Sequence, residues 1–113
     1  MEENKVILNS LYLFDGATEV IDSEVISNVK GSILTLQIKC DSTFELEIQG
    51  NLLINDEDYT VLGAIDMTSL SKKTSITTEG IYQIDISGCR KVKASIVSIG
   101  ESPLTVYATV KEG

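Results

Sequence analysis

The sequence predicts an all-β fold, a jelly-roll-like antiparallel β-sandwich of about eight or nine short strands. Three observations predict it. Apolar and polar residues alternate with a period of two, Val, Ile and Thr dominate the alternating segments, and turn residues recur about every ten residues. The chain has 113 residues, which is enough for one hydrophobic core. We therefore expect residues 1–113 to form a single domain.

The most regular strand covers residues 34–40, where Leu34, Leu36 and Ile38 alternate with polar residues. Residues 44–49 repeat this pattern after a very short link. Because so short a link joins two alternating segments, we predict that they form a hairpin.

Residues 82–86, 92–96 and 104–110 alternate in the same way, so each predicts a strand with one buried face. The connection at residues 99–103 is rich in turn residues, and we predict a hairpin between the last two strands. Residues 59–66 are apolar on both faces, which is typical of a more central strand.

Residues 5–14 and 18–27 are rich in β-forming residues but alternate less regularly. Asp15 and Gly16 lie between them and predict a turn. Residues 66–73 are the one ambiguous segment, because Asp66 or Thr68 could cap a single helical turn. We expect a loop there.

The charge balance excludes two classes of partner. The formal net charge is −8, from 17 acidic and 9 basic residues, and such a surface repels phosphate backbones and anionic headgroups. No basic segment followed by an apolar one occurs near Met1, and no apolar run reaches the ~20 residues that cross a bilayer. We expect no nucleic acid and no membrane as partner.

Histidine is absent, so the usual general base and the middle member of a nucleophilic triad are missing. Glu45 and Glu47 lie on one strand face and could in principle cleave a glycosidic bond. Alternating Glu residues are more typical of a solvated strand face, and no apolar cleft can be recognised beside them. We expect no enzymatic activity and no catalytic residue.

Metal and thiol chemistry are not indicated either. Residues 55–58 are acidic and could hold calcium, but their spacing lacks the pattern of a calcium loop, so we expect a solvated turn and no metal. Cys40 and Cys89 have no zinc or thiol-exchange spacing, and we expect free thiols, with a disulfide between two strands as the alternative. No cofactor is expected.

The segments LTLQI at 34–38, FELEIQG at 44–50, YTVLGAID at 59–66, ITTEGIYQIDISG at 76–88 and VKASI at 92–96 resemble those of small phage virion proteins. The similar proteins are capsid decoration, head-fibre, and collar or tail-associated domains. The stretch at 78–88 carries most of the resemblance, which covers some two-thirds of the chain. Where such domains often have Trp, this chain has Tyr59.

The resemblance implies a non-enzymatic capsid decoration or accessory protein, made in the bacterial cytoplasm and located on the virion surface. Its partner would be the major capsid protein, another virion protein or a second copy of the chain. The alternative is a carbohydrate-binding or adhesion module of a head or tail fibre. Exposed aromatic rings are the usual platforms for sugars, and Tyr59 and Tyr107 are the candidates.

Residues 1–30 lie outside the resemblance and are either an arm that docks on a partner or additional core strands. This segment holds more apolar residues than one half-exposed strand needs. The candidate contact residues for a partner are therefore Val6, Leu8, Leu11, Leu13 and Phe14, together with Tyr59 and Tyr107.

Overall fold

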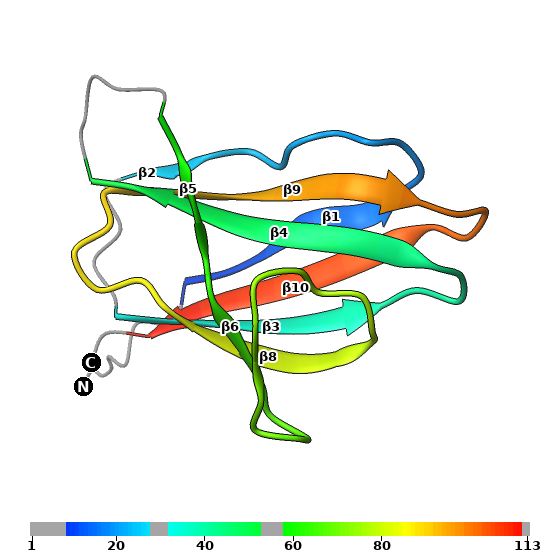
Figure 1. Ribbon diagram of the computed structural model, residues 1–113. Coiled ribbons are helices and arrows are strands. Elements are labelled where there is room, and N and C mark those ends of the chain that lie inside the picture. Colours follow the sequence, from blue (N-terminus) through cyan, green and yellow to red (C-terminus); the bar gives the residue numbers. More distant parts are fainter. Residues whose placement is uncertain (1–8, 28–31, 53–57, 112–113) are drawn as a thin grey trace, which may run out of the picture.

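The computed structural model describes residues 9–27, 32–52 and 58–111, and every regular element in these ranges is a β-strand (Figure 1). The strands are β1 (Asn9–Ala17), β2 (Ile26–Ser27), β3 (Ile33–Lys39), β4 (Phe44–Asn51), β5 (Thr60–Leu62), β6 (Ala64–Asp66), β7 (Lys72–Lys73), β8 (Gly80–Asp85), β9 (Lys91–Ile99) and β10 (Leu104–Lys111). The predicted all-β class is confirmed.

Two antiparallel sheets pack face to face. The six-stranded sheet has the order β1-β10-β3-β8-β6-β7, and the four-stranded sheet has the order β2-β9-β4-β5. Eight strands thus wrap as β1-β10-β3-β8 over β2-β9-β4-β5, which is the order of a jelly-roll-like sandwich. The β6–β7 hairpin is added at the β8 side.

Both predicted hairpins are wrong. β3 and β4 lie in different sheets, and so do β9 and β10. Each short link is therefore an arch that carries the chain from one sheet to the other. The two arches lie at the same end of the sandwich and bind each other: the Gly100 N–H donates to the Thr43 carbonyl at 2.8 Å, and the Ser102 N–H donates to Ser42 Oγ at 3.0 Å.

The segment predicted as a central strand also changes sheet. Its first half is β5, at the edge of the four-stranded sheet, and its second half is β6, between β8 and β7 (Figure 1). Gly63 lies at the crossing, where a Cβ atom would meet the side chain of Lys72. The segment is apolar on both faces because its two halves belong to different sheets. It is not a central strand of one sheet.

The predicted turn at Asp15 and Gly16 is a β-bulge. β1 continues through both residues and stays paired with β10 as far as Ala17 opposite Leu104. Gly16 has φ = 77°, a conformation that glycine adopts without steric cost. The 18–27 segment contains only the short strand β2, preceded by a bridge between Asp22 and Ser95 of β9.

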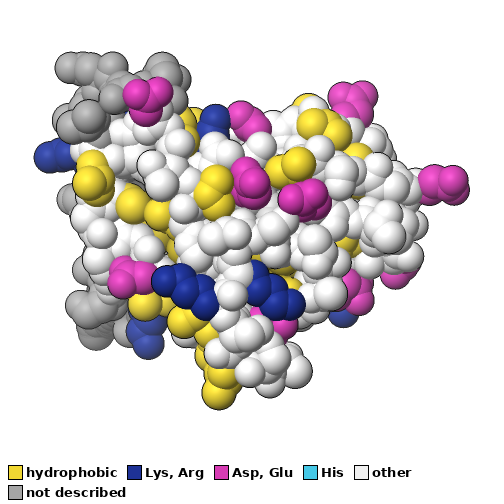
Figure 2. Space-filling model, viewed as in Figure 1, with side chains coloured by type: hydrophobic (Ala, Val, Ile, Leu, Met, Phe, Trp, Pro, Cys, Tyr) yellow, Lys and Arg dark blue, Asp and Glu magenta, His cyan; other side chains and the backbone are white. Residues whose placement is uncertain are grey.

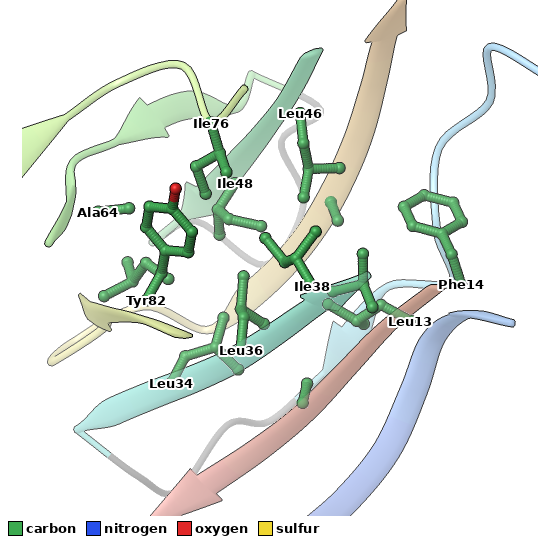
Figure 3. Packing of buried hydrophobic residues seen from close by; sticks show 14 of the residues in the cluster. Leu13, Phe14, Leu34, Leu36, Ile38, Leu46, Ile48, Ala64, Ile76 and Tyr82 are labelled. Atoms are coloured by element: carbon green, nitrogen blue, oxygen red, sulfur yellow. The ribbon is translucent and has the colours of Figure 1, made fainter. Parts of the chain in front are cut away.

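A second bulge in β1 brings Leu13 and Phe14 into the core together. They join the inward side chains of both sheets, and Figure 3 shows these packed against one another in one cluster. Labelled members are Leu13, Phe14, Leu34, Leu36, Ile38, Leu46, Ile48, Ala64, Ile76 and Tyr82. Residues 9–17 therefore form a core strand and not a separate arm.

This placement predicts that substitutions of Phe14 and Tyr12, two residues of β1, lower the free energy of unfolding by very different amounts. Phe14→Ala should lower the free energy of unfolding by about 3–5 kcal/mol, because it leaves a cavity in the core. Tyr12→Ala removes an outward side chain and should cost about 1 kcal/mol or less. Urea unfolding followed by circular dichroism measures both values. Equal costs for the two variants would contradict the placement of β1.

Candidate docking face

The outer face of the six-stranded sheet carries a row of large exposed side chains. Register places Tyr12 of β1 opposite Tyr107 of β10, Tyr107 opposite Gln37 of β3, and Gln37 opposite Ile81 of β8. Met67 follows β6, and its N–H donates to the Ile81 carbonyl at 2.9 Å. We call these five residues the outer row.

The outer row is continuous because neighbouring strands lie about 4.8 Å apart, so five positions span roughly 20 Å. All five side chains are exposed, with 55% exposure at Tyr12 and 37% at Tyr107. Four of the five are apolar or aromatic. A row of this kind is a candidate contact surface, whereas single exposed apolar residues are ordinary.

The chemistry of the face changes along the row. At one end, Tyr12, Tyr107, Gln37, Lys39 and Thr105 line an open hollow of about 480 Å³, which we call the tyrosine hollow. At the other end, exposed aliphatic side chains gather at the β6–β7 hairpin. We call this group the hairpin end, and its members are Ile65, Met67, Leu70 and Ile81.

The β6–β7 turn is held by its own polar groups. The Leu70 N–H donates to the Asp66 carbonyl at 2.6 Å, the Asp66 N–H donates to the Ser71 carbonyl at 2.9 Å, and the Thr68 N–H donates to Asp66 Oδ1 at 2.9 Å. The predicted loop is thus the turn of a hairpin, and Asp66 stabilises this turn without capping a helical one.

Leu70 is an unusual residue for its backbone conformation in this turn. It has φ = 61°, the left-handed region that glycine or asparagine normally occupies, and its side chain is 72% exposed. A Leu residue in this position is strained and gains nothing from burial within the chain. Strain of this kind concentrates at functional sites.

The central rows of the outer face hold no acidic residue, although the chain as a whole is acidic; Asp15, opposite Thr105, and Asp85, opposite Ile33, lie at the two ends of the face. The row beside the outer row consists of Thr109, Thr35, Gln83 and Ile65 in register. In Figure 2, acidic side chains are scattered over both the upper and the lower parts of the molecule, and hydrophobic side chains extend onto the lobe at the bottom. This lobe is the position of the β6–β7 turn in Figure 1.

The outer face of the four-stranded sheet is charged and self-paired. Lys93 Nζ lies 2.8 Å from Asp22 Oδ2 and 4.4 Å from the centroid of the Tyr59 ring. The hydrogen bond from Lys93 lowers the pKa of Asp22 below its usual value. Glu45 accepts a hydrogen bond from Ser75 at 2.7 Å. This face satisfies its charges internally, so it is the weaker candidate for docking.

The sequence-predicted contact residues separate into three groups. The core contains Leu13 and Phe14, and Leu11 packs against it. Because Leu13 and Phe14 are buried, their side chains are not accessible to a partner. Tyr59 is half-buried beside Lys91 and Lys93, and Tyr107 lies in the outer row. Val6 and Leu8 lie outside the described residues. Sequence reasoning missed Tyr12, Met67, Leu70 and Ile81.

The other chemical candidates do not come together. Glu45 and Glu47 do not line the tyrosine hollow, and Glu47 accepts a hydrogen bond from Gln49. Within the described ranges no three His, Cys, Asp or Glu residues are placed to bind a metal. Of residues 55–58, only Asp58 is described. The same ranges contain no helix of the length and hydrophobicity that a membrane span requires.

The two cysteines are free thiols at opposite ends of the sandwich. Cys40 is buried beside the arches, and its thiol donates to the Ser102 carbonyl at 3.6 Å. Cys89 is half-buried, and burial, together with the charge of Asp85, raises the pKa of its thiol. A raised pKa keeps Cys89 protonated and poorly nucleophilic.

Comparison with known proteins identifies the fold. No protein-family model and no curated protein matches the chain. The crystal structure of the SPBc2 prophage-derived protein YomS matches 95% of this chain and 98% of YomS, with a TM-score of 0.79 and 24% identity. The PBSX exported protein XepA matches 97% of this chain, with a TM-score of 0.86 and 12% identity, over 39% of its own length. At these identities the likeness shows a shared fold.

The strain at Leu70 is testable. Leu70→Gly should leave the free energy of unfolding unchanged or raise it by up to ~1 kcal/mol, because glycine adopts positive φ freely. Leu70→Ala removes nearly the same exposed side chain but keeps the strain, so it should be about 1 kcal/mol less stable than Leu70→Gly. Both values come from urea unfolding. A Gly variant less stable than the Ala variant would show that Leu70 is not strained.

Proposed function

We propose that this chain is a non-enzymatic structural protein of a phage particle, an accessory protein that docks on the assembled capsid. It is made in the host cytoplasm and resides on the virion surface. Its partner is the major capsid protein or another virion protein, and docking involves no covalent change.

The fold supports the phage assignment. The prophage-derived protein YomS shares the sandwich and is matched over nearly its whole length as well as that of this chain, and the PBSX exported protein XepA shares the sandwich too. The resemblance of residues 34–96 to virion proteins points in the same direction. A fold can host unrelated functions, so the assignment to docking rests on the surface.

The observation that carries the proposal is the hairpin end. Its apolar side chains are exposed on β6, on β8 and on the protruding turn between β6 and β7, and one of them, Leu70, occupies a backbone conformation that disfavours it. Burial in a partner would recover the cost of this exposure, since burying a whole aliphatic side chain contributes about 1.5–3 kcal/mol. Few such residues are needed, because a small number of contacts dominates most interfaces.

The charge distribution suits a particle surface. The hairpin end contains no charged side chain, whereas the whole chain carries a net charge of −8. If the hairpin end contacts the shell, the acidic groups on the outer face of the four-stranded sheet remain in solvent. Like charge there would keep neighbouring particles apart in suspension.

Docking predicts a selective effect of the hairpin end. The double variant Met67→Ser, Leu70→Gly should bind undecorated capsids of the encoding phage at least about tenfold more weakly in co-sedimentation, because tenfold corresponds to only ~1.4 kcal/mol. The matched control is Val97→Ser, since Val97 on β9 is 42% exposed and Met67 is 39% exposed. Val97→Ser should bind like the unmodified protein. Unchanged binding by the double variant would exclude the hairpin end as the docking surface.

A further inference from the structure

The tyrosine hollow lies outside the hairpin end, and its two Tyr rings are arranged in a specific way. The rings of Tyr12 and Tyr107 are 5.0 Å apart between centroids and lie at 65° to each other, which is an edge-to-face pair. Two rings at this angle form a corner and not a flat platform. A ring-shaped ligand placed in this corner would lie against the face of one Tyr and the edge of the other.

The polar groups of the hollow lie beside this corner. Gln37 faces Tyr107 across the β10–β3 pair, and Lys39 faces Thr105 in the same register. Thr105 Oγ1 accepts a hydrogen bond from the Gly16 N–H at 3.2 Å, which fixes the oxygen and leaves its proton available to donate. The hollow thus offers an amide, a hydroxyl and an ammonium group, and none of its lining residues is acidic.

The site is also rigid and of suitable size. Its residues lie on the paired strands β1, β10 and β3, and register fixes the positions of all five. The hollow measures about 480 Å³, within the ~300–1,000 Å³ typical of small-molecule sites. A site on paired strands holds its geometry better than one on loops.

We propose that the tyrosine hollow binds one pyranose ring of a surface glycan. A pyranose has an apolar C–H face that can lie on a phenol ring, and a rim of hydroxyls that can pair with Gln37, Thr105 and Lys39. A nucleic acid is disfavoured by the net charge of −8. An extended peptide would add to an open sheet edge, whereas the hollow lies on the sheet face.

The proposal is independent of capsid docking. The hollow occupies the β1, β10 and β3 end of the outer row, and the hairpin end lies beyond β8. A particle-bound protein attached through the hairpin end can therefore keep the hollow open to solvent. In that arrangement the chain would attach the particle to a carbohydrate surface.

The test uses single-ring probes, namely the methyl glycosides of glucose, galactose and glucuronic acid, in saturation-transfer and amide chemical-shift NMR on the full chain. We expect millimolar binding of at least one probe, with shifts centred on Tyr12, Gln37 and Tyr107. Tyr12→Ala should weaken this binding at least about tenfold, since it removes one wall of the corner. Val97→Ser and the Met67→Ser, Leu70→Gly double variant should bind the sugar normally.

Two results would overturn the proposal. One is that no probe binds in the millimolar range, or that Tyr12→Ala binds as well as the unmodified protein. The other is that Tyr12→Ala abolishes capsid co-sedimentation, which would make the hollow part of the protein interface. Failure of capsid docking alone, with sugar binding intact in the double variant, would contradict only the proposed function.

Discussion

The register of the six-stranded sheet is the constraint on which both candidate surfaces depend. Leu34, Leu36 and Ile38 of β3 are fully buried, and β10 packs its alternate residues beside them. Because side chains alternate with a period of two, a slip of one residue would bring Gln37 or Tyr107 into the core. The core therefore fixes the face of the outer row: any arrangement that buries the apolar residues also places Tyr107, Gln37 and Ile81 on the outer face, and the observed register aligns them. The β1 bulge extends this alignment, since it buries Leu13 and Phe14 and still leaves Tyr12 outward.

The hairpin end arises from a different feature, the passage of the chain from β5 to β6. The crossing at Gly63 adds β6 and β7 to the β8 side of the larger sheet, where their turn protrudes. The hydrogen bonds of this turn come from backbone groups and the Asp66 side chain, so its fold does not need an aliphatic residue at position 70. The proposed contact with the capsid would account for a solvent-exposed Leu70 at positive φ. Both the backbone conformation and the exposure to water at position 70 disfavour a Leu residue. Positions that break local rules in this way are expected to be functional or strained sites.

Much of the fold follows from alternation alone, because a strand with one buried face needs apolar residues at every second position wherever it lies. Alternation identified the inward residues of β3, β4, β8, β9 and β10 correctly. It could not assign strands to sheets, since a short link suits an arch as well as a hairpin, and the contact between Gly100 and Thr43 that unites the arches is not local. Asp15 and Gly16 were misread because a bulge and a turn both favour glycine at positive φ. Tyr107 was recognised as outward, whereas Tyr12 was missed because the adjacent bulge breaks the alternation of β1.

The central claim is that the chain sits on a phage shell through the hairpin end of its outer face. Electron cryo-microscopy of the encoding phage, with the sandwich fitted into density, tests this claim most directly. The account predicts sandwich density on the capsid exterior, with Met67 and Leu70 at the contact and the corner formed by Tyr12 and Tyr107 open to solvent. Contact through the four-stranded sheet, or absence of the chain from the particle, would contradict it.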